Sequence, residues 1–206
     1  MIKMLAEKYN GIACEENYHD VKLSELDSSE FPGLTYTNLE MNHMKVIFLD
    51  IDGVLNSNFW NDTHQREISD GTLVDEEKVM LLGQLIRNTN AKVVLHSGWK
   101  FWFDSEVKPL RKEAERLICI LAKEGIKVDG VTPDHTTEEI RKSKKFSLVK
   151  ASEILAWVSQ YDNIEKWIVI DDLDLHNEEI RKHQILTDAS IGLTAENIRE
   201  AETLLL

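Results

Sequence analysis

An apolar run that ends in two acidic residues constrains this chain more than any other feature. Val46–Leu49 contains four apolar residues rich in β-formers, and Asp50-Ile51-Asp52-Gly53 follows directly. Such a run is typical of a strand buried on both faces of a parallel sheet. In these sheets, functional side chains lie just beyond the carboxyl ends of the strands. Two interpretations are open: a functional site, or a turn in which both carboxylates bond to backbone amides.

From residue 45 onward, strand-like and helix-like segments alternate. We expect strands at Val46–Leu49, Lys92–Leu95, Ile126–Val131, Trp167–Ile170 and Gln184–Leu186. We expect helices after the capping residue Asp75, from Asp104 or Ser105 to Gly125, at Leu148–Ser159, at Asn177–His183, and after the cap Thr194. This alternation predicts an α/β fold: a three-layer, Rossmann-like parallel sheet with helices on both faces.

Three of the expected strands end in polar residues that would meet at one edge of the sheet. The first ends in Asp50 and Asp52, the second in Ser97, and the fourth in Asp171 and Asp172. Four carboxylates that converge there would repel one another strongly without a cation. Oxygen-only ligation selects a hard ion, and Mg²⁺ with few protein carboxylates plus water is the usual solution. Two acidic strand ends in one sheet therefore favour a metal site over a turn.

Lys150 is unusual because of its place in an expected helix. It falls in the first turn of Leu148–Ser159, where the helix dipole disfavours a cation. An ammonium group that must reach an anion at the sheet edge would explain this position. A lysine that points to solvent is the alternative, and local sequence alone does not decide between them.

The 206 residues are enough for one α/β domain with additional segments. Residues 1–44 differ from the rest, with three Lys against eight acidic residues and a turn at Phe31-Pro32-Gly33. We therefore predict an acidic N-terminal extension of unknown role at 1–44 and a catalytic domain at 45–206.

The formal net charge of −13 argues against broad, non-specific binding to nucleic acid, which depends on Lys and Arg neutralising phosphates. It leaves room for a small basic site, and it suits a protein that gathers metal cations.

Cysteine content and hydropathy predict the compartment. Cys14 and Cys119 are the only cysteines and lack metal-ligand spacing, so we expect a reduced, cytoplasmic protein, with Cys119 in the core. No window approaches the ~18 consecutive apolar residues of a membrane span. The start, MIKMLAEKYNG, lacks the apolar core of a signal peptide, and no membrane partner is expected.

The order of these motifs resembles the haloacid dehalogenase (HAD)-like hydrolase superfamily. It runs from FLDIDGVLNS through an apolar strand ending in Ser and a Lys at a helix start to IVIDDLD. Within the superfamily, VVLHSGWK, VDGVTP, KASEILAWV, WIVIDDLDL and GLTAENI together resemble a group of small HAD domains associated with RNA-repair proteins. Residues 56–74 are too short for a large cap domain, so the resemblance implies a minimal cap or none.

The resemblance implies different roles for the acidic residues. Asp50 would be the nucleophile that forms an aspartyl-phosphate, and Asp52 the acid and base that serves the leaving group and then water. Mg²⁺ would be held by Asp50, the backbone carbonyl of Asp52 and Asp172, with Asp171 ligating it or orienting a bound water. An acid at the position of Asp52 implies phosphoryl transfer rather than dehalogenation.

The resemblance also implies a phosphate-binding set. The Ser97 hydroxyl, nearby backbone amides including that of Gly98, and the Lys150 ammonium would hold the phosphoryl oxygens where negative charge develops.

These roles together predict a Mg²⁺-dependent phosphomonoester hydrolase. A nucleotide or a nucleic-acid terminal phosphate is the leading substrate. The alternatives are a small-metabolite phosphatase, a non-catalytic binding or regulatory module of the same fold, and a phosphate-receiver domain.

Several residues near the motifs have two interpretations. The aromatic residues could stack on a base, but packing is the favoured interpretation: Phe59, Trp60, Trp99, Phe101 and Trp102. The basic residues at 141–145 could contact a nucleic-acid backbone or simply face solvent: Arg141, Lys142, Lys144 and Lys145. For His96, a hydrogen-bonded structural role is favoured over substrate binding.

Overall fold

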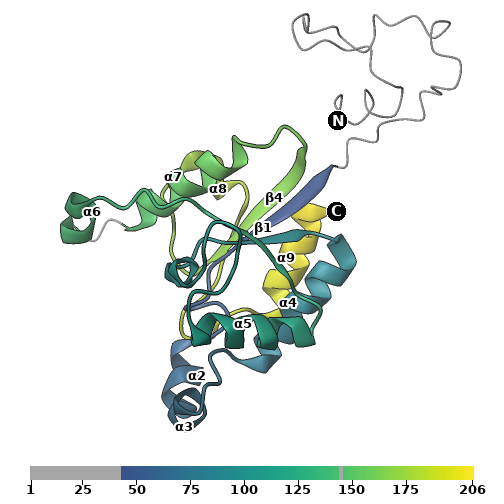
Figure 1. The fold of residues 1–206 in the computed structure, drawn as a ribbon. Helices are drawn as coiled ribbons and strands as arrows, with labels where there is room; N and C mark the ends of the chain where they lie inside the picture. The colour runs from purple at the N-terminus through teal and green to yellow at the C-terminus, as the bar shows by residue number, and fades with distance from the viewer. Residues whose placement is uncertain (1–42, 144–145) are drawn as a thin grey trace, which may run out of the picture. The chain divides into compact units, whose positions relative to one another are not determined.

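The computed structural model describes residues 43–143 and 146–206 (Figure 1). The predicted N-terminal extension lies outside these residues except for its last two positions. The division of the chain at residue 45 therefore stays a prediction.

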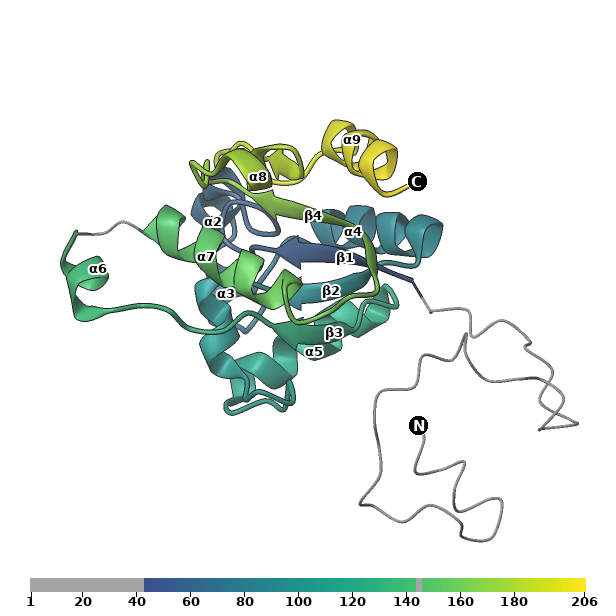
Figure 2. The ribbon, with the colours of Figure 1, turned by 90° about the horizontal axis from the view of Figure 1, so that it is seen from above.

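Five parallel strands form one sheet (Figure 2). Their order is β3-β2-β1-β4-β5, with bounds β1 Met44–Leu49, β2 Lys92–Leu95, β3 Val128–Val131, β4 Ile164–Asp171 and β5 Gln184–Leu186. In the central strand, Leu49 pairs with Leu95 of β2 and with Ile170 of β4. The carboxyl ends of β1, β2 and β4 therefore lie next to one another, as the strand pattern predicted.

Alternate residues of β1 pack against different layers of helices. Ile47 and Leu49 belong to a core cluster with α4 (Glu76–Thr89), α5 (Lys112–Lys123) and α9 (Ala195–Leu205). Val46 and Phe48 belong to a second cluster with α7 (Phe146–Val158) and α8 (Glu178–Arg181). Because side chains alternate along a strand, β1 is buried on both faces, which confirms the three-layer α/β fold.

Four short helical elements complete the described chain: α2 (Asn58–Thr63), α3 (Gln65–Ser69), the 3₁₀ helix η2 (Gly98–Trp102) and α6 (Glu138–Ser143). The first two fill the stretch between β1 and α4, so this stretch holds a small substructure rather than a large cap domain. Among the described residues, no helix combines the length and the apolar character needed to cross a membrane.

Two predicted helix caps are present. The Asp75 carboxylate accepts a hydrogen bond from the amide of Glu77 at 2.9 Å. The Thr194 hydroxyl accepts a hydrogen bond from the amide of Asn197 at 3.2 Å. The Asn197 side chain in turn accepts one from the Thr194 amide. Both caps satisfy amide groups that have no partner within the first helical turn.

The predicted start of α5 is wrong. The helix begins at Lys112 rather than after Asp104 or Ser105. The Asp104 carboxylate accepts hydrogen bonds from the amides of Glu106 and Lys108, at 2.9 and 2.8 Å, and so holds a turn instead of capping a helix.

The predicted burial of Cys119 is also wrong, because this side chain is exposed. Leu117 and Leu121 face the core and are fully buried. Cys119 lies midway between them along the helix and therefore points to the opposite side, since residues two apart are on opposite faces.

Lys150 lies deeper in its helix than predicted. Because α7 begins at Phe146, Lys150 falls in the second turn rather than the first. The unfavourable helix dipole is therefore weaker there than expected, and the position of Lys150 has to be explained by its contacts.

Candidate functional site

Carboxylates gather where β1 and β4 end side by side. The Asp50 amide donates to the Ile170 carbonyl at 2.9 Å and holds the two strand ends together. Asp50, Asp171 and Asp172 each place an oxygen within 4.8 Å of the others. Asp50 is 4% exposed and Asp171 is fully buried. Three of the four residues predicted to bind metal therefore come together.

The Lys150 ammonium reaches this carboxylate cluster from α7. Its Nζ lies 2.8 Å from Asp171 Oδ2 and 3.3 Å from Asp50 Oδ1. Burial alone lowers the pKa of Lys150, but the two carboxylates outweigh it and hold the pKa above its ordinary value. The side chain therefore stays charged and does not point to solvent.

One ammonium does not neutralise three carboxylates. Burial, opposed chiefly by Lys150, raises the pKa of Asp50. Burial and the neighbouring charges of Asp171 and Asp50 raise the pKa of Asp172 to about 6. Both carboxyl groups are thus less stable in their charged form here than in water, which is the condition that a bound cation would relieve.

The donor chemistry of the cluster fits a hard divalent cation. Its side chains offer oxygen atoms alone, the set that Mg²⁺ prefers. Gly53 allows Asp172 to join the cluster, because a Cβ at position 53 would lie 2.5 Å from the Asp172 Cγ. Asp50, Asp171 and Asp172 are the residues that could hold the ion, together with the predicted ligand from the Asp52 backbone carbonyl.

The Asp52 carboxylate is separate from this cluster and exposed. Its Oδ1 accepts a hydrogen bond from Asn56 Nδ2 at 3.0 Å, and its Oδ2 accepts one from Trp99 Nε1 at 2.8 Å. The turn interpretation of the Asp50-Ile51-Asp52-Gly53 stretch, with both carboxylates on backbone amides, therefore does not describe this structure. The two acids have different surroundings, which suits two different roles.

Ser97 and Gly98 lie where β2 ends. Ser97 is fully buried. Its hydroxyl oxygen accepts a hydrogen bond from the amide of Trp99 at 3.2 Å and so caps the start of η2. This bond uses an oxygen lone pair and leaves the hydroxyl proton for a ligand. Gly98 is exposed, and a Cβ there would meet open space. Their contact with phosphate stays a prediction.

Comparison with known families agrees with this geometry. Residues 46–198 match the family described as HAD domain in Swiss Army Knife RNA repair proteins. The chain belongs to this family. The resemblance drawn from the sequence is thereby confirmed, and the family assignment indicates a HAD-type hydrolase. No curated protein and no solved structure matches the chain.

In this HAD domain, His96 is buried directly behind the carboxylate cluster. Neither ring nitrogen makes a hydrogen bond of ordinary length and angle among the described residues, and Nδ1 lies 3.6 Å from Asp171 Oδ2. Burial, followed by the positive charge of Lys150, lowers the pKa of His96 to about 3. His96 is therefore neutral. A hydrogen bond with the Ile170 backbone acts in the opposite direction on this pKa but is outweighed, so the favoured structural role of His96 stays a prediction.

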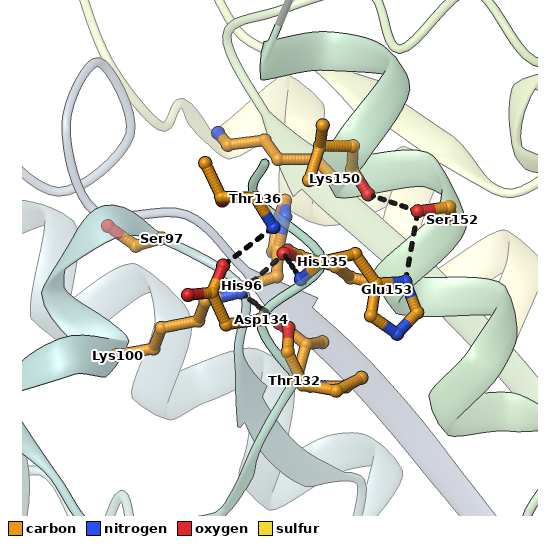
Figure 3. Close-up of polar contacts among 12 residues, drawn as sticks. His96, Ser97, Lys100, Thr132, Asp134, His135, Thr136, Lys150, Ser152 and Glu153 are labelled. Carbon is orange, nitrogen blue, oxygen red and sulfur yellow. Dashed lines mark hydrogen bonds and ion pairs between the residues drawn. The ribbon is translucent and has the colours of Figure 1, made fainter. Parts of the chain in front are cut away.

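A buried ion pair ties together the segments of the HAD domain that carry Ser97 and Lys150 (Figure 3). Lys100 Nζ lies 2.6 Å from Glu153 Oε2, and both side chains are almost fully buried. The ammonium also donates to the carbonyl of Pro133 at 2.7 Å and to the Thr132 hydroxyl at 3.3 Å. The other Glu153 oxygen accepts from the His135 amide at 2.9 Å.

Sequence reasoning missed this pair. Lys100 follows Ser97 by three residues in η2, and Glu153 follows Lys150 by three residues in α7, so each charge is on the same element as a predicted phosphate-binding group. One feature of the sequence could have indicated the pair: Glu153 is a single acidic residue among apolar positions of α7, which include Ala151, Ile154 and Trp157.

The remaining aromatic and basic residues that could contact a nucleic acid differ in how exposed their side chains are. Trp60 is 8% exposed and stacks on His64, which agrees with packing. Phe59 and Phe101 are exposed. Arg141 and Lys142 are exposed on α6, whereas Lys144 and Lys145 lie outside the described residues.

Proposed function

We propose that this HAD domain is a Mg²⁺-dependent phosphomonoester hydrolase that works through an aspartyl-phosphate on Asp50. The observation that supports it is the meeting of Asp50, Asp171 and Asp172 with the Lys150 ammonium at one sheet edge. Asp52 follows Asp50 by two residues and lies outside the cluster, in a position suited to proton transfer.

The first step forms the bond between an Asp50 oxygen and phosphorus while the ester P–O bond breaks. Asp52 gives a proton to the departing oxygen, because an alkoxide is a poor leaving group without one. In the second step Asp52 takes a proton from water. The water oxygen bonds to phosphorus, the bond from phosphorus to Asp50 breaks, and inorganic phosphate leaves.

Lys150, the Ser97 hydroxyl and the Gly98 amide bind the phosphoryl oxygens and orient them for in-line attack. Bound Mg²⁺ would supply positive charge that lets an anionic nucleophile approach an anionic phosphate. Lys150 contributes charge of the same sign, since its ammonium reaches Asp50 from α7.

We propose a nucleotide or nucleic-acid terminal phosphate as the substrate. The description of the family, HAD domains of RNA repair proteins, supports this class. The small substructure of α2 and α3 supports it as well, because a site without a large cap is accessible to a polymer end.

The nucleophile is tested by Asp50→Asn. This variant should turn over p-nitrophenyl phosphate with Mg²⁺ at less than about 10⁻³ of the wild-type rate, because an amide oxygen does not form the intermediate. Its far-UV circular dichroism should match the wild type. Asp162→Asn, an exposed residue before β4, serves as the matched control and should keep full activity. Mg²⁺-dependent turnover by Asp50→Asn at the wild-type rate would refute the mechanism.

The substrate class is tested by comparing oligonucleotides phosphorylated at the 5′ or 3′ end with nucleoside monophosphates and sugar phosphates. We expect the highest kcat/KM for a nucleotide or an oligonucleotide end. A clear preference for sugar phosphates would instead identify a small-metabolite phosphatase.

A further inference from the structure

Two side chains from different parts of the chain hold the Asp52 carboxylate. Asn56 Nδ2 donates to Oδ1 at 3.0 Å and Trp99 Nε1 donates to Oδ2 at 2.8 Å. An exposed aspartate that lacked such partners would sample several rotamers, whereas one donor on each oxygen selects a single orientation. Each oxygen has two lone pairs, so each keeps one at which a proton can bind.

The indole that makes one of these bonds is itself held in place. Trp99 stacks on Trp102, with ring centroids 4.4 Å apart and planes inclined by 29°. The Arg111 guanidinium lies 5.1 Å from the Trp102 ring and covers it. The Trp99 amide also donates to the Ser97 hydroxyl at 3.2 Å. The ring is therefore fixed by its own backbone and by a supporting stack.

We propose that Trp99 is a positioning residue for Asp52. Its indole N–H fixes the carboxylate in the orientation from which Asp52 delivers a proton to the leaving oxygen. This inference rests on the proposed function, because the proton transfer is part of that reaction. The segment after β2 then has two roles, since Ser97 binds phosphate and Trp99 orients the acid.

The step that depends on Trp99 is the first one. The proton moves from an Asp52 oxygen to the ester oxygen while the bond from that oxygen to phosphorus breaks and the bond to Asp50 forms. Trp99 keeps its own proton throughout. A nitrophenolate leaves readily without a proton, whereas the more basic phenolate depends on one. Loss of the indole N–H should therefore affect phenyl phosphate more than p-nitrophenyl phosphate.

The test compares Trp99→Phe with the matched control Trp102→Phe. Both variants keep an aromatic ring in the stack, but only the first removes the donor to Asp52. For Trp99→Phe with Mg²⁺ we expect kcat/KM to fall at least ~10-fold for phenyl phosphate and less than ~3-fold for p-nitrophenyl phosphate. Trp102→Phe should reduce both by the same small factor. The ratio kcat/KM includes the chain of steps up to loss of the leaving group, so the later use of Asp52 as a base does not affect it.

An equal loss on both esters, or no loss on either, would overturn the role of Trp99. A double-mutant cycle adds a measurement that poor packing would not mimic: in an Asp52→Ala background, Trp99→Phe should cause no further loss on phenyl phosphate. Independent, multiplying losses would overturn the proposal. If the wild type hydrolyses neither ester, the proposed function fails and this inference with it. An active wild type in which Trp99→Phe matches Trp102→Phe overturns this inference alone.

Discussion

Gly53 lets the loop after β1 lie against Asp172. Its φ of +72° is in the left-handed region, and a Cβ would lie 2.5 Å from the Asp172 Cγ and 2.6 Å from Oδ2. Both restrictions act at one position: the backbone conformation disfavours other residues, and the carboxylate fills the space where a side chain would start. Asp172 can therefore lie next to Asp50 because position 53 has no side chain.

Gly53→Ala should therefore cost ~1–3 kcal/mol of stability and displace the Asp172 carboxylate. We expect a lower urea midpoint and a smaller rise in Tm on addition of Mg²⁺. Gly130→Ala is the matched control, since its Cβ would meet atoms no closer than 3.6 Å. A Gly53→Ala variant that keeps the full Mg²⁺ response would show that Asp172 does not bind the ion.

The raised pKa of Asp172 predicts how stability depends on pH. The folded state binds this proton more tightly than the unfolded state, so this group lowers the stability of the metal-free protein as pH rises from 3.8 to about 6. A divalent cation needs the carboxylate and competes with the proton. The Mg²⁺-induced rise in Tm should thus be full at about pH 7.5 and nearly absent at about pH 5. Thermal unfolding with and without Mg²⁺ at several pH values measures it, and a rise independent of pH would contradict the assignment.

At the scale of elements, the buried pair of Lys100 and Glu153 links η2, the loop after β3 and α7. The Lys100 ammonium uses all three of its donors, on Glu153, Pro133 and Thr132. Apolar residues of similar volume would pack at these positions, but they would not bond the loop. The pair therefore fixes the relative position of the two elements that carry Ser97 and Lys150.

Removing one partner of this pair should be more harmful than removing both. We expect Lys100→Met to cost ~3–5 kcal/mol, because it leaves the Glu153 charge buried and unpaired. The double variant with Glu153→Leu should recover much of that loss. Lys108→Met is the surface control, since Lys108 pairs with Glu106 where both side chains are 70% exposed. Urea unfolding measures all three, and a double variant that is no more stable than Lys100→Met would show that the unpaired Glu153 charge is not the cause of the loss.

For the molecule as a whole, the sequence predicted best what local pattern determines. Short continuous apolar runs predicted the strands, and Asp75 and Thr194 predicted two helix starts, because both signals depend on neighbouring residues. The bond from Trp99 to Asp52 and the pair of Lys100 with Glu153 span 47 and 53 residues. No local rule predicts which distant side chain will complete a polar contact, so these two contacts can be seen only in the folded structure.

The predicted division at residue 45 can be tested with a shortened chain. Residues 43–206 contain the five strands and the helices that cover both sheet faces, and the family match begins at residue 46. We expect this fragment to fold with a Tm within a few degrees of the full chain and to have the proposed phosphatase activity at the level of the full chain. A fragment that is unfolded by circular dichroism would show that residues 1–42 are part of the domain.

The strand order has a consequence for the growing chain on the ribosome. β1 lies in the middle of the sheet, yet the partner on one of its sides, β4, spans Ile164–Asp171 and is synthesised more than a hundred residues later. Until then that edge of β1 has no β4 to pair with, which exposes nascent chains to misassociation. The carboxylates of β1 and β4 also meet only at that late stage. A translation product that stops before β4 therefore carries Asp50, the proposed nucleophile, without Asp171 and Asp172, the other proposed ligands of the ion.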